Sequence, residues 1–503
     1  MYKIEFNLTQ VRASFWQILP GLLSWSTLIG LVVLSFTLPF WVAIFIIVFD
    51  MYILIRAVYM SVHLVHAYRR LRHLKDVDWL TKAKRATGHL SWSRVHHIVI
   101  IPTYDESLDV LRTTLDGLKN TDFIKNNMHV VVGFEARVGD IAKKKAQTVT
   151  QEYTQHFGTF LTTMHPDGLP GEKRVKSANA NWAVKAMEKK LAAKGINTKQ
   201  ILVSNFDSDT VVGQGYFSYL TYIFITHPDP YHVSYQPLPM YHNNVWDAPA
   251  FSRVVATGST FWQMIESTRP ERLVTFSSHS MTLQALKDVG YWQPNIVSED
   301  SRIFWQCLVR YDGHYRAEPL YTTVSMDAAL GKSWWQTLKN QYKQKRRWAW
   351  GIENFPYIAE RFLRNKKMPL RTKLTYIWRT LEGHYSWATA PIIVAALGWL
   401  PIIVGGPEFQ ITTLSYNLPF ITRTIMTIAM TGLVLSGILT YYLLPPKPRH
   451  VTSWRYLSFA WMWVLVPAIA TLLSAIPALD SETRLMLGRD LNFNVMQKHR
   501  KKA

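Results

Sequence analysis

Two aspartates stand directly after an apolar segment in the middle of the chain. The segment 200–206 has the composition of a buried strand and runs into Asp207-Ser208-Asp209. Side chains two residues apart in an extended segment point the same way, so both carboxylates are expected to face one site. Such a pair can hold Mg²⁺ or Mn²⁺ through one or two oxygens while a diphosphate supplies others. A solvated turn is the alternative interpretation, but the position after an apolar strand favours a metal site.

A second acidic pair opens a predicted helix. Ser298 is a suitable N-cap residue, and Glu299 and Asp300 fall in the first turn of the helix. Acids at this position either compensate the helix dipole or place a carboxylate at a functional site. The residues by themselves leave both interpretations open.

A basic and aromatic segment follows at 344–351. It begins at Gln344 and contains Arg347 and Trp348, so that cations and indoles occupy one helical turn. One interpretation is an anchor at the membrane surface that binds anionic lipid, with tryptophan at the level of the headgroups. The other is a functional motif, because the segment lies just before a long apolar region.

Strands and helices alternate around these residues. The apolar run 97–101 leads into a polar loop that ends at Glu106, and the run 129–134 leads to Glu135. A helical pattern that starts near Ser107 lies between the two runs. Alternation of this kind predicts an α/β domain with a mixed, mostly parallel sheet, whose ligands gather at the carboxyl ends of the strands.

Long charge-free segments lie on both sides of this domain. No Lys, Arg, Asp or Glu occurs between Arg12 and Asp50, which is about twice the roughly 20 residues that cross a bilayer. We expect two helices here, divided near Pro39. Three further runs, at 385–407, 424–446 and 456–479, are each long enough to span. The sequence therefore predicts membrane helices at both ends of the chain.

The distribution of basic residues predicts the orientation. The segment 69–94, after the second helix, has eight Lys and Arg residues against two aspartates, so it and the central domain should lie in the cytoplasm. The basic tail also favours the cytoplasm, although five crossings would place it outside. Either the run 456–479 is re-entrant, broken at Pro467 and Pro477, or the charge rule fails for the tail.

We divide the chain into four parts on this basis. These are a membrane region with two helices (1–66), a cytosolic domain (67–370), a second membrane region with about three transmembrane or re-entrant helices (371–483) and a basic tail (484–503).

Composition limits the classes of protein. The 503 residues include 56 Lys and Arg against 34 Asp and Glu, a net charge of +22 that points to a polyanionic partner such as nucleic acid, an anionic membrane or a phosphorylated substrate. Cys307 is the single cysteine, which excludes an internal disulfide and a cysteine-based metal cluster. The long charge-free segments favour a membrane over nucleic acid.

Four motifs in order resemble those of the membrane-integrated family 2 glycosyltransferases, which include cellulose, hyaluronan and chitin synthases. The motifs are Pro102 to Glu106, Asp207-Ser208-Asp209, Ser298-Glu299-Asp300 and Gln344 to Trp348. The resemblance covers about residues 98–351 and extends to the flanking helices. It implies a cytosolic α/β domain of the GT-A fold inserted between N- and C-terminal transmembrane helices.

The resemblance also implies a role for individual residues. The nucleotide pocket would contain Pro102, Thr103, Tyr104 and Glu106, with Glu135 contacting the base. Lys176, or alternatively Lys173, would lie beside the donor diphosphate. Metal and diphosphate would bind at Asp207 and Asp209, and the catalytic pair would be Glu299 and Asp300, with Asp300 as general base. Donor diphosphate and acceptor would contact Gln344, Arg347 and Trp348.

Two departures from the family pattern concern the pocket and the acceptor. Asp105 stands where the family usually has asparagine. The segment 257–261 occupies the region of an acceptor loop in cellulose-type enzymes, but the family's cysteine is absent, which puts cellulose-like acceptor handling in doubt.

The expected function is an inverting transfer of a sugar from a nucleotide-diphospho-sugar, a UDP-sugar by resemblance, to a glycan or lipid-linked acceptor, with Mg²⁺ or Mn²⁺. Processive synthesis of a polysaccharide and a single transfer that forms a glycolipid are both compatible with the motifs. A different class of function is a non-catalytic membrane scaffold that binds polyanions through its basic face. Acidic residues at strand and helix ends argue against the scaffold.

Overall fold

The structure is a computed structural model that describes residues 14–449 and 451–491. The described chain forms two compact units. The first contains the described parts of 1–55 and 466–492 together with 342–430, and the second contains 56–341 and 431–465.

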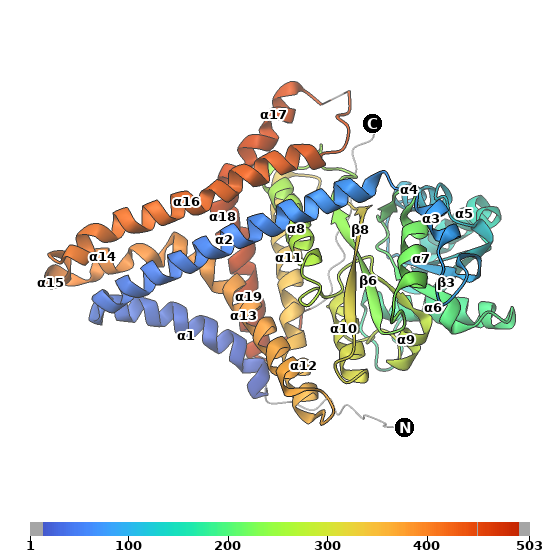
Figure 1. The fold of residues 1–503 in the computed structure, drawn as a ribbon, viewed down its shortest axis with the longest axis horizontal. Coiled ribbons are helices and arrows are strands. Elements are labelled where there is room, and N and C mark those ends of the chain that lie inside the picture. Colours follow the sequence, from blue (N-terminus) through green and yellow to red (C-terminus); the bar gives the residue numbers. More distant parts are fainter. Residues whose placement is uncertain (1–13, 450, 492–503) are drawn as a thin grey trace. The chain divides into compact units, whose positions relative to one another are not determined.

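The second unit contains an eight-stranded sheet (Figure 1). Its strands follow the order β3-β2-β1-β4-β7-β6-β8-β5. The strands are β1 His96–Pro102, β2 Met128–Glu135, β3 Thr159–His165, β4 Ile201–Asn205, β5 Val211–Val212, β6 Val233–Met240, β7 Ser280–Thr282 and β8 Arg316–Ser325. Four of the seven neighbouring pairs are parallel and three are antiparallel. The predicted mixed, mostly parallel sheet is therefore confirmed.

The register brings the carboxyl ends of three strands to one edge of the sheet. Pro102 at the end of β1 is opposite Gly133 on β2, and Ile100 is opposite Asn205 at the end of β4. The strands β2 and β4 are buried along their whole length because helices cover the sheet. Apolar runs without alternation are typical of such doubly covered strands. This packing holds the loops after β1, β2 and β4 close together.

Helices surround and flank the sheet. In the second unit, or passing into it, these are α2 Pro39–Lys75, α3 Trp79–Arg85, α4 Leu108–Lys119, α5 Asp140–Tyr153, α6 Lys176–Ala193, α7 Tyr216–Thr226, α8 Ala250–Ser267, α9 Leu283–Asp288, α10 Glu299–Arg310, α11 Trp334–Ala349, α16 Thr413–Leu443 and α17 Ser453–Trp461. The remaining α-helices are α1 Phe15–Thr37, α12 Asn354–Arg364, α13 Leu370–Ala395, α14 Leu400–Val404, α15 Gly406–Gln410, α18 Val466–Ala470 and α19 Ile476–Met486. Short 3₁₀ turns include Ala136–Val138, Leu397–Trp399 and Met462–Leu465, and Thr471–Ala475 is a π-turn.

Four described helices are long and apolar enough to cross a membrane. They are Phe15–Thr37, Pro39–Lys75, Thr413–Leu443 and Ser453–Met486. A bent pair, Leu370–Ala395 and Leu397–Val404, meets at 49° and gives a fifth candidate if it is one span. The apolar helices thus flank the sheet domain in sequence on both sides, as predicted.

The structure bears on two local expectations. The segment 453–486 qualifies by length and composition as one span through Pro467 and Pro477, and the described helix pair that is bent by 49° joins α13 to the helices after Leu397. A re-entrant segment and a failure of the charge rule both stay predictions. The proposed acceptor-loop segment 257–261 is not a loop, because it lies in the middle of α8. The four-part division of the chain stays a prediction, and the end of the basic tail lies outside the described residues.

Candidate active site

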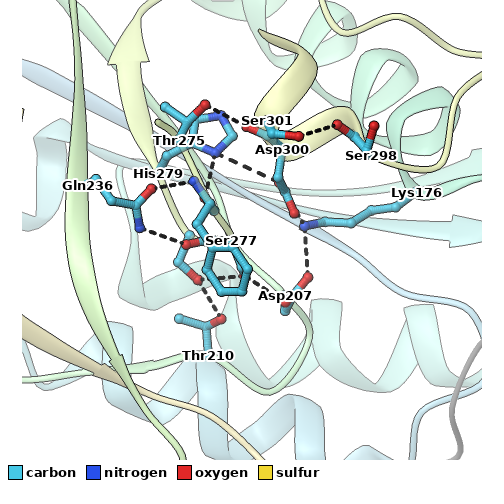
Figure 2. Close-up of polar contacts among 12 residues, drawn as sticks. Lys176, Asp207, Thr210, Gln236, Thr275, Ser277, His279, Ser298, Asp300 and Ser301 are labelled. Atoms are coloured by element: carbon cyan, nitrogen blue, oxygen red, sulfur yellow. Dashed lines mark hydrogen bonds and ion pairs between the residues drawn. The ribbon is translucent and has the colours of Figure 1, made fainter. Parts of the chain in front are cut away.

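One ammonium group joins two of the sequence-predicted carboxylates. Lys176 Nζ lies 2.7 Å from Asp207 Oδ1 and 3.5 Å from Asp300 Oδ1 (Figure 2). Asp207 follows β4, Asp300 lies in the first turn of α10, and Lys176 is the first residue of α6. Three segments far apart in sequence therefore meet at the carboxyl edge of the sheet, where ligands of open α/β sheets bind.

Lys176 is held as a cation in this position. Burial lowers the pKa of Lys176, but the charges of Asp207, Asp300 and Glu299 raise it more, so the net pKa lies above the ordinary value. Its side chain is only 11% exposed, whereas the carboxylates of Asp207 and Asp300 are 27% and 25% exposed. The site thus presents two partly open carboxylates on either side of a permanent positive charge.

Residues before β7 complete the carboxylate site, although nothing in the sequence pattern selects them. Ser277 Oγ donates to Asp207 Oδ2 at 2.6 Å, and Thr275 Oγ1 donates to the backbone carbonyl of Asp300 at 2.6 Å (Figure 2). Gln236 on β6 holds this segment by accepting from the amide of Phe276 at 2.6 Å. These contacts orient both acids, but serine and threonine in a loop carry no distinctive sequence signal.

His279 is a further neighbour of Asp300 that sequence reasoning missed. Its Nδ1 lies 3.8 Å from Asp300 Oδ1 and 3.0 Å from the carbonyl oxygen of Phe276. Burial lowers the pKa of His279 despite the nearby acid, so the ring is neutral at pH 7. Because a carbonyl only accepts, Nδ1 donates to Phe276. The histidine therefore supports the segment beside Asp300 without adding charge.

Asp207 and Asp209 do not share the extended geometry that the sequence predicted. The amide of Thr210 donates to the carbonyl of Asp207 at 2.9 Å, which closes a turn at this point. Asp209 is 2% exposed, and its Oδ2 accepts from the amide of Asp327 at 2.9 Å. The turn rotates the second carboxylate onto different partners, because turn formation breaks the alternation of an extended chain.

The donor set suits a divalent cation through Asp207. The described residues contain no group of three or more His, Cys, Asp or Glu that would hold a metal by themselves. Mg²⁺ and similar cations are commonly bound by one or two carboxylates together with substrate phosphates. Asp207 offers a partly exposed carboxylate of this kind, and buried Asp209 lies two residues away.

In the loop after β1, the carboxylate of Glu106 hydrogen-bonds to other residues of the same loop. Glu106 Oε2 accepts from Thr103 Oγ1 at 2.6 Å and from the amide of Tyr104 at 2.8 Å. Lys145 on α5 lies 2.9 Å from Asp105, the residue that departs from the family pattern. The loop predicted to line a nucleotide pocket is therefore fixed in shape.

Glu135 lies in a charged cluster with residues that the sequence did not indicate. Its Oε2 is 3.3 Å from Arg137 Nε and 3.5 Å from His165 Nδ1, and His165 Nε2 is 2.9 Å from Glu172. The guanidinium of Arg137 lies 4.6 Å from the centre of the Tyr104 ring. Burial lowers the pKa of His165, but its hydrogen bonds to the two glutamates raise it more, and the net shift is upward. The cluster joins the ends of β2 and β3 to the loop that leads to α6.

Asparagines anchor α6 at this edge. Asn179 Nδ2 donates to the carbonyl of Gly133 at 2.8 Å, and Asn181 exchanges hydrogen bonds with the backbone of Trp292. These contacts set the position of Lys176 at the start of the same helix. The alternative lysine, Lys173, is exposed, and its amide donates to the carbonyl of Pro294.

Glu299 belongs to the site around Lys176, and three other predicted residues lie on α11. Glu299 is the first residue of α10 and is 3% exposed. Gln344, Arg347 and Trp348 lie on the part of α11 that belongs to the first unit, and their role at the donor and the acceptor stays a prediction. Within that unit, Lys345 Nζ lies 5.0 Å from the centre of the Trp348 ring.

Comparison with protein families gives one match. A family model described as glycosyl transferase family group 2 matches residues 202–478, which is more than half of the chain. Comparison with curated proteins found no matching sequence.

Two solved structures are examples of low similarity to this chain. The mannosyltransferase PcManGT from Pyrobaculum calidifontis, in complex with GDP-Man and Mn²⁺, has 12% sequence identity and a TM-score of 0.39, covering 84% of this chain and 99% of that chain. Residues 1–349 of TarS from S. aureus, in complex with UDP-GlcNAc, have 12% identity and a TM-score of 0.38, covering 81% and 98%. Likenesses at this level do not identify a donor or an acceptor for the chain.

Proposed function

Since the chain belongs to glycosyl transferase family group 2, we propose that it is an inverting membrane glycosyltransferase with a nucleotide-diphospho-sugar donor. Its sheet domain has the GT-A-like mixed fold. The observation that carries the proposal is the ammonium of Lys176 between Asp207 and Asp300 at the carboxyl edge of the sheet. The diphosphate requires a cation, and the acceptor hydroxyl requires a carboxylate that can take its proton. Both groups are present in this arrangement.

The carboxylate of Asp300 acts as the general base. The acceptor oxygen attacks the anomeric carbon from the side opposite the nucleotide diphosphate, and the bond from that carbon to the diphosphate oxygen breaks with its electron pair. The proton of the acceptor hydroxyl passes to Asp300, and the configuration at the anomeric carbon inverts. General bases of this kind contribute about 10² to 10⁴ to the rate.

Charge on the leaving diphosphate is neutralised by the chain's own cation, and a divalent metal would add to this when bound. Lys176 supplies a fixed positive charge that does not have to reorganise during the reaction. Mg²⁺ or Mn²⁺, held through Asp207 with Asp209 nearby, would withdraw charge from the phosphate oxygens when bound. Ser277 keeps the Asp207 carboxylate turned toward this position.

The nucleotide end of the donor binds along the loops after β1 and β2. Pro102, Thr103, Tyr104 and Glu106 form its wall, and Glu135 meets the base, which is uracil by resemblance to the family. Gln344, Arg347 and Trp348 contact the donor diphosphate and the acceptor. The indole of Trp348 offers a flat apolar face for a sugar ring.

The chain works at a membrane, with its catalytic domain in the cytoplasm. Its apolar helices flank the sheet domain in sequence, and exposed Lys and Arg residues follow α2. We assign the transferred group as a hexose and the acceptor as a glycan or a lipid-linked sugar. Extension of a polysaccharide, as in cellulose, hyaluronan and chitin synthases, is the main form of the proposal, and a single transfer to a lipid is its second form.

Radiolabelled nucleotide sugars test the proposal. Purified protein in lipid vesicles is incubated with a panel of UDP- and GDP-sugars, with Mg²⁺ or Mn²⁺, and the labelled products are separated by size. We expect label from a UDP-sugar to enter product, and Asp300→Asn to abolish most of it. Long chains would indicate polymer synthesis, and a small organic-soluble product would indicate a glycolipid. Absence of transfer from every donor with both metals would contradict the proposal.

A further inference from the structure

Two arginines in the second unit lie together without an acidic partner. Arg253 on α8 is 5% exposed, and Arg455 lies on α17. Across residues 14–449 and 451–491, the contacts of the two guanidinium groups include no ion pair with an aspartate or glutamate. A buried charge normally has an oppositely charged partner, so two neighbouring arginines without an acid require an explanation.

The contacts of the two arginines hold them in place without neutralising them. Arg253 Nη2 donates to Ser458 Oγ at 3.0 Å, and the guanidinium carbon lies 4.2 Å from the centre of the Phe459 ring. Arg455 donates to the backbone carbonyls of Trp246 and Ala248. All of these partners are uncharged.

Several buried donors at this place lack an acceptor. Arg253 Nε, Arg253 Nη1 and Trp246 Nε1 are buried and have no hydrogen-bond partner within the described chain. They belong to one cluster, because the rings of Trp246 and Phe459 are 5.1 Å apart and Arg253 lies over Phe459. A set of buried groups with donors in excess and two positive charges is complementary to an anion rich in acceptor oxygens.

The electrostatics agree with these contacts. Burial lowers the pKa of Arg253 to about 10, and the charge of Arg455 contributes to the shift. Arg253 therefore stays charged at neutral pH, and the two guanidinium groups repel each other. An anion between them would remove the repulsion.

The position of the pair indicates where the anion comes from. Arg455 lies in the first turn of α17, at the beginning of the candidate span Ser453–Met486. On the same helix, Trp454, Leu457 and Trp461 are 76%, 50% and 68% exposed. Exposed tryptophans at the start of an apolar span are typical of the level of lipid headgroups. Lipid phosphates lie at that level.

We propose that Arg253 and Arg455 form a binding site for the phosphate of an anionic phospholipid. Arginine binds phosphate oxygens through paired N–H donors, and the indole of Trp246 adds a third donor. The apolar face of α17 would pack on the acyl chains of the same lipid. This lipid site shares no residue with the proposed donor site, and it would bind anionic phospholipids at the surface formed by α8 and α17.

Lipid retention measured by native mass spectrometry tests the site. Delipidated full-length protein is titrated with phosphatidylglycerol, with phosphatidylcholine or with inorganic phosphate. We expect phosphatidylglycerol to bind at least about 10-fold more tightly than phosphatidylcholine, and Arg455→Gln to remove most of that preference. Lys447→Gln removes an exposed cation from the loop before α17 and should leave the preference unchanged.

The results of these titrations distinguish a specific lipid site from nonspecific attraction of anionic lipid to a basic protein. If Arg455→Gln and Lys447→Gln lower the affinity equally, or if the two lipids bind alike, the proposal is wrong. Competition by inorganic phosphate at the lipid's own concentration would also overturn it, because the site would then take the free anion. Arg253 is buried, so Arg253→Gln is used only if the variant folds. The second variant is Arg455→Lys, which keeps the charge but loses the paired N–H donors of the guanidinium. We expect it to have an intermediate affinity.

Discussion

Lys176 determines how the candidate active site works at the scale of single residues. Its ammonium meets Asp207 and Asp300 from a buried position, so the two acids can lie near each other without strong repulsion. When a diphosphate binds, the same cation would face a stronger anion. The carboxylate of Asp300 would then be released from its 3.5 Å contact and become available to accept a proton.

The variant Asp300→Asn tests the base. An amide keeps the size of the carboxylate but cannot accept the proton, so we expect transfer to fall by about 10² to 10⁴ while donor binding persists. Turnover and donor affinity are measured side by side. Asp140→Asn, which alters an exposed aspartate on α5, is the control and should change neither. Unchanged turnover in Asp300→Asn would remove this residue from the role of base.

The predicted residues could be found because each acid follows a recognisable element. Asp207 comes after an apolar strand, and Asp300 follows a good N-cap residue. Ser277 and His279 could not be found, because they act only through partners that the fold brings close. The turn at Asp209 was also missed. One of its hydrogen bonds joins the amide of Thr210 to the carbonyl of Asp207, and the other joins the amide of Asp327, from a distant part of the chain, to the Asp209 carboxylate.

Among the elements, the loop between β3 and α6 carries charged contacts beside the predicted nucleotide pocket. His165 ends β3, reaches Glu135 on β2 and holds Glu172 in the loop. Arg174 and Asp167 form a second ion pair across the same loop, at 2.7 Å. The loop leads directly into Lys176, so its shape affects the position of the ammonium.

The raised pKa of His165 predicts a dependence of stability on pH. The folded chain holds this proton more tightly than the unfolded chain, whose histidine pKa is about 6.5. The stabilisation is therefore complete below that pH and is lost as pH rises through the raised value. We expect His165→Gln to reduce the fall in thermal unfolding temperature between pH 6 and pH 9. Equal effects of His165→Gln and of the exposed control His314→Gln would contradict this prediction.

The contact between β2 and α6 predicts the effect of a single methyl group. A Cβ added at Gly133 would lie 2.2 Å from Asn179 Oδ1, so Asn179 and the start of α6 would have to move. We expect Gly133→Ala to destabilise the protein by about 1–3 kcal/mol and to weaken donor binding. Gly213→Ala, where the added group meets open space, is the control. Thermal unfolding and nucleotide titration measure both effects, and a fully stable Gly133→Ala with normal binding would contradict the role of this contact.

Sequence patterns predicted the elements with the strongest local signal. The apolar runs that form β1, β2 and β4 stood out because they are buried on both faces. The strand β7 has three residues and pairs with β4 and β6 from a distant part of the chain, so no local pattern could reveal it. The segment 257–261 was expected as a loop by analogy, yet the helical apolar pattern of α8 decides its structure.

The whole molecule combines a sheet domain with apolar helices at both ends of its described sequence. The distribution of charges along the chain is enough to separate these parts, because a bilayer excludes unpaired charges. Charge distribution does not fix the number of crossings, because the bent pair Leu370–Ala395 and Leu397–Val404 adds a fifth candidate only if it is one span.

Cysteine labelling tests the predicted orientation. Cys307 is fully buried and is the single cysteine, so an introduced cysteine would be the reactive one. On intact cells, a membrane-impermeant maleimide should label Glu408→Cys on α15, because one crossing on each side of this residue would place it outside. Lys84→Cys, on α3, should react only after the membrane is permeabilised. The reverse pattern would show that the catalytic domain faces away from the cytoplasm.

The position of the bound donor shows whether Lys176 and Asp207 hold the diphosphate. We would determine the structure of Asp300→Asn by cryo-electron microscopy with an unhydrolysed UDP-sugar and Mn²⁺, in lipid nanodiscs. We expect diphosphate density within hydrogen-bonding distance of Lys176 Nζ, metal density against Asp207, and the anomeric carbon facing residue 300. Nucleotide bound at another edge of the sheet, or a diphosphate remote from Lys176, would contradict this expectation.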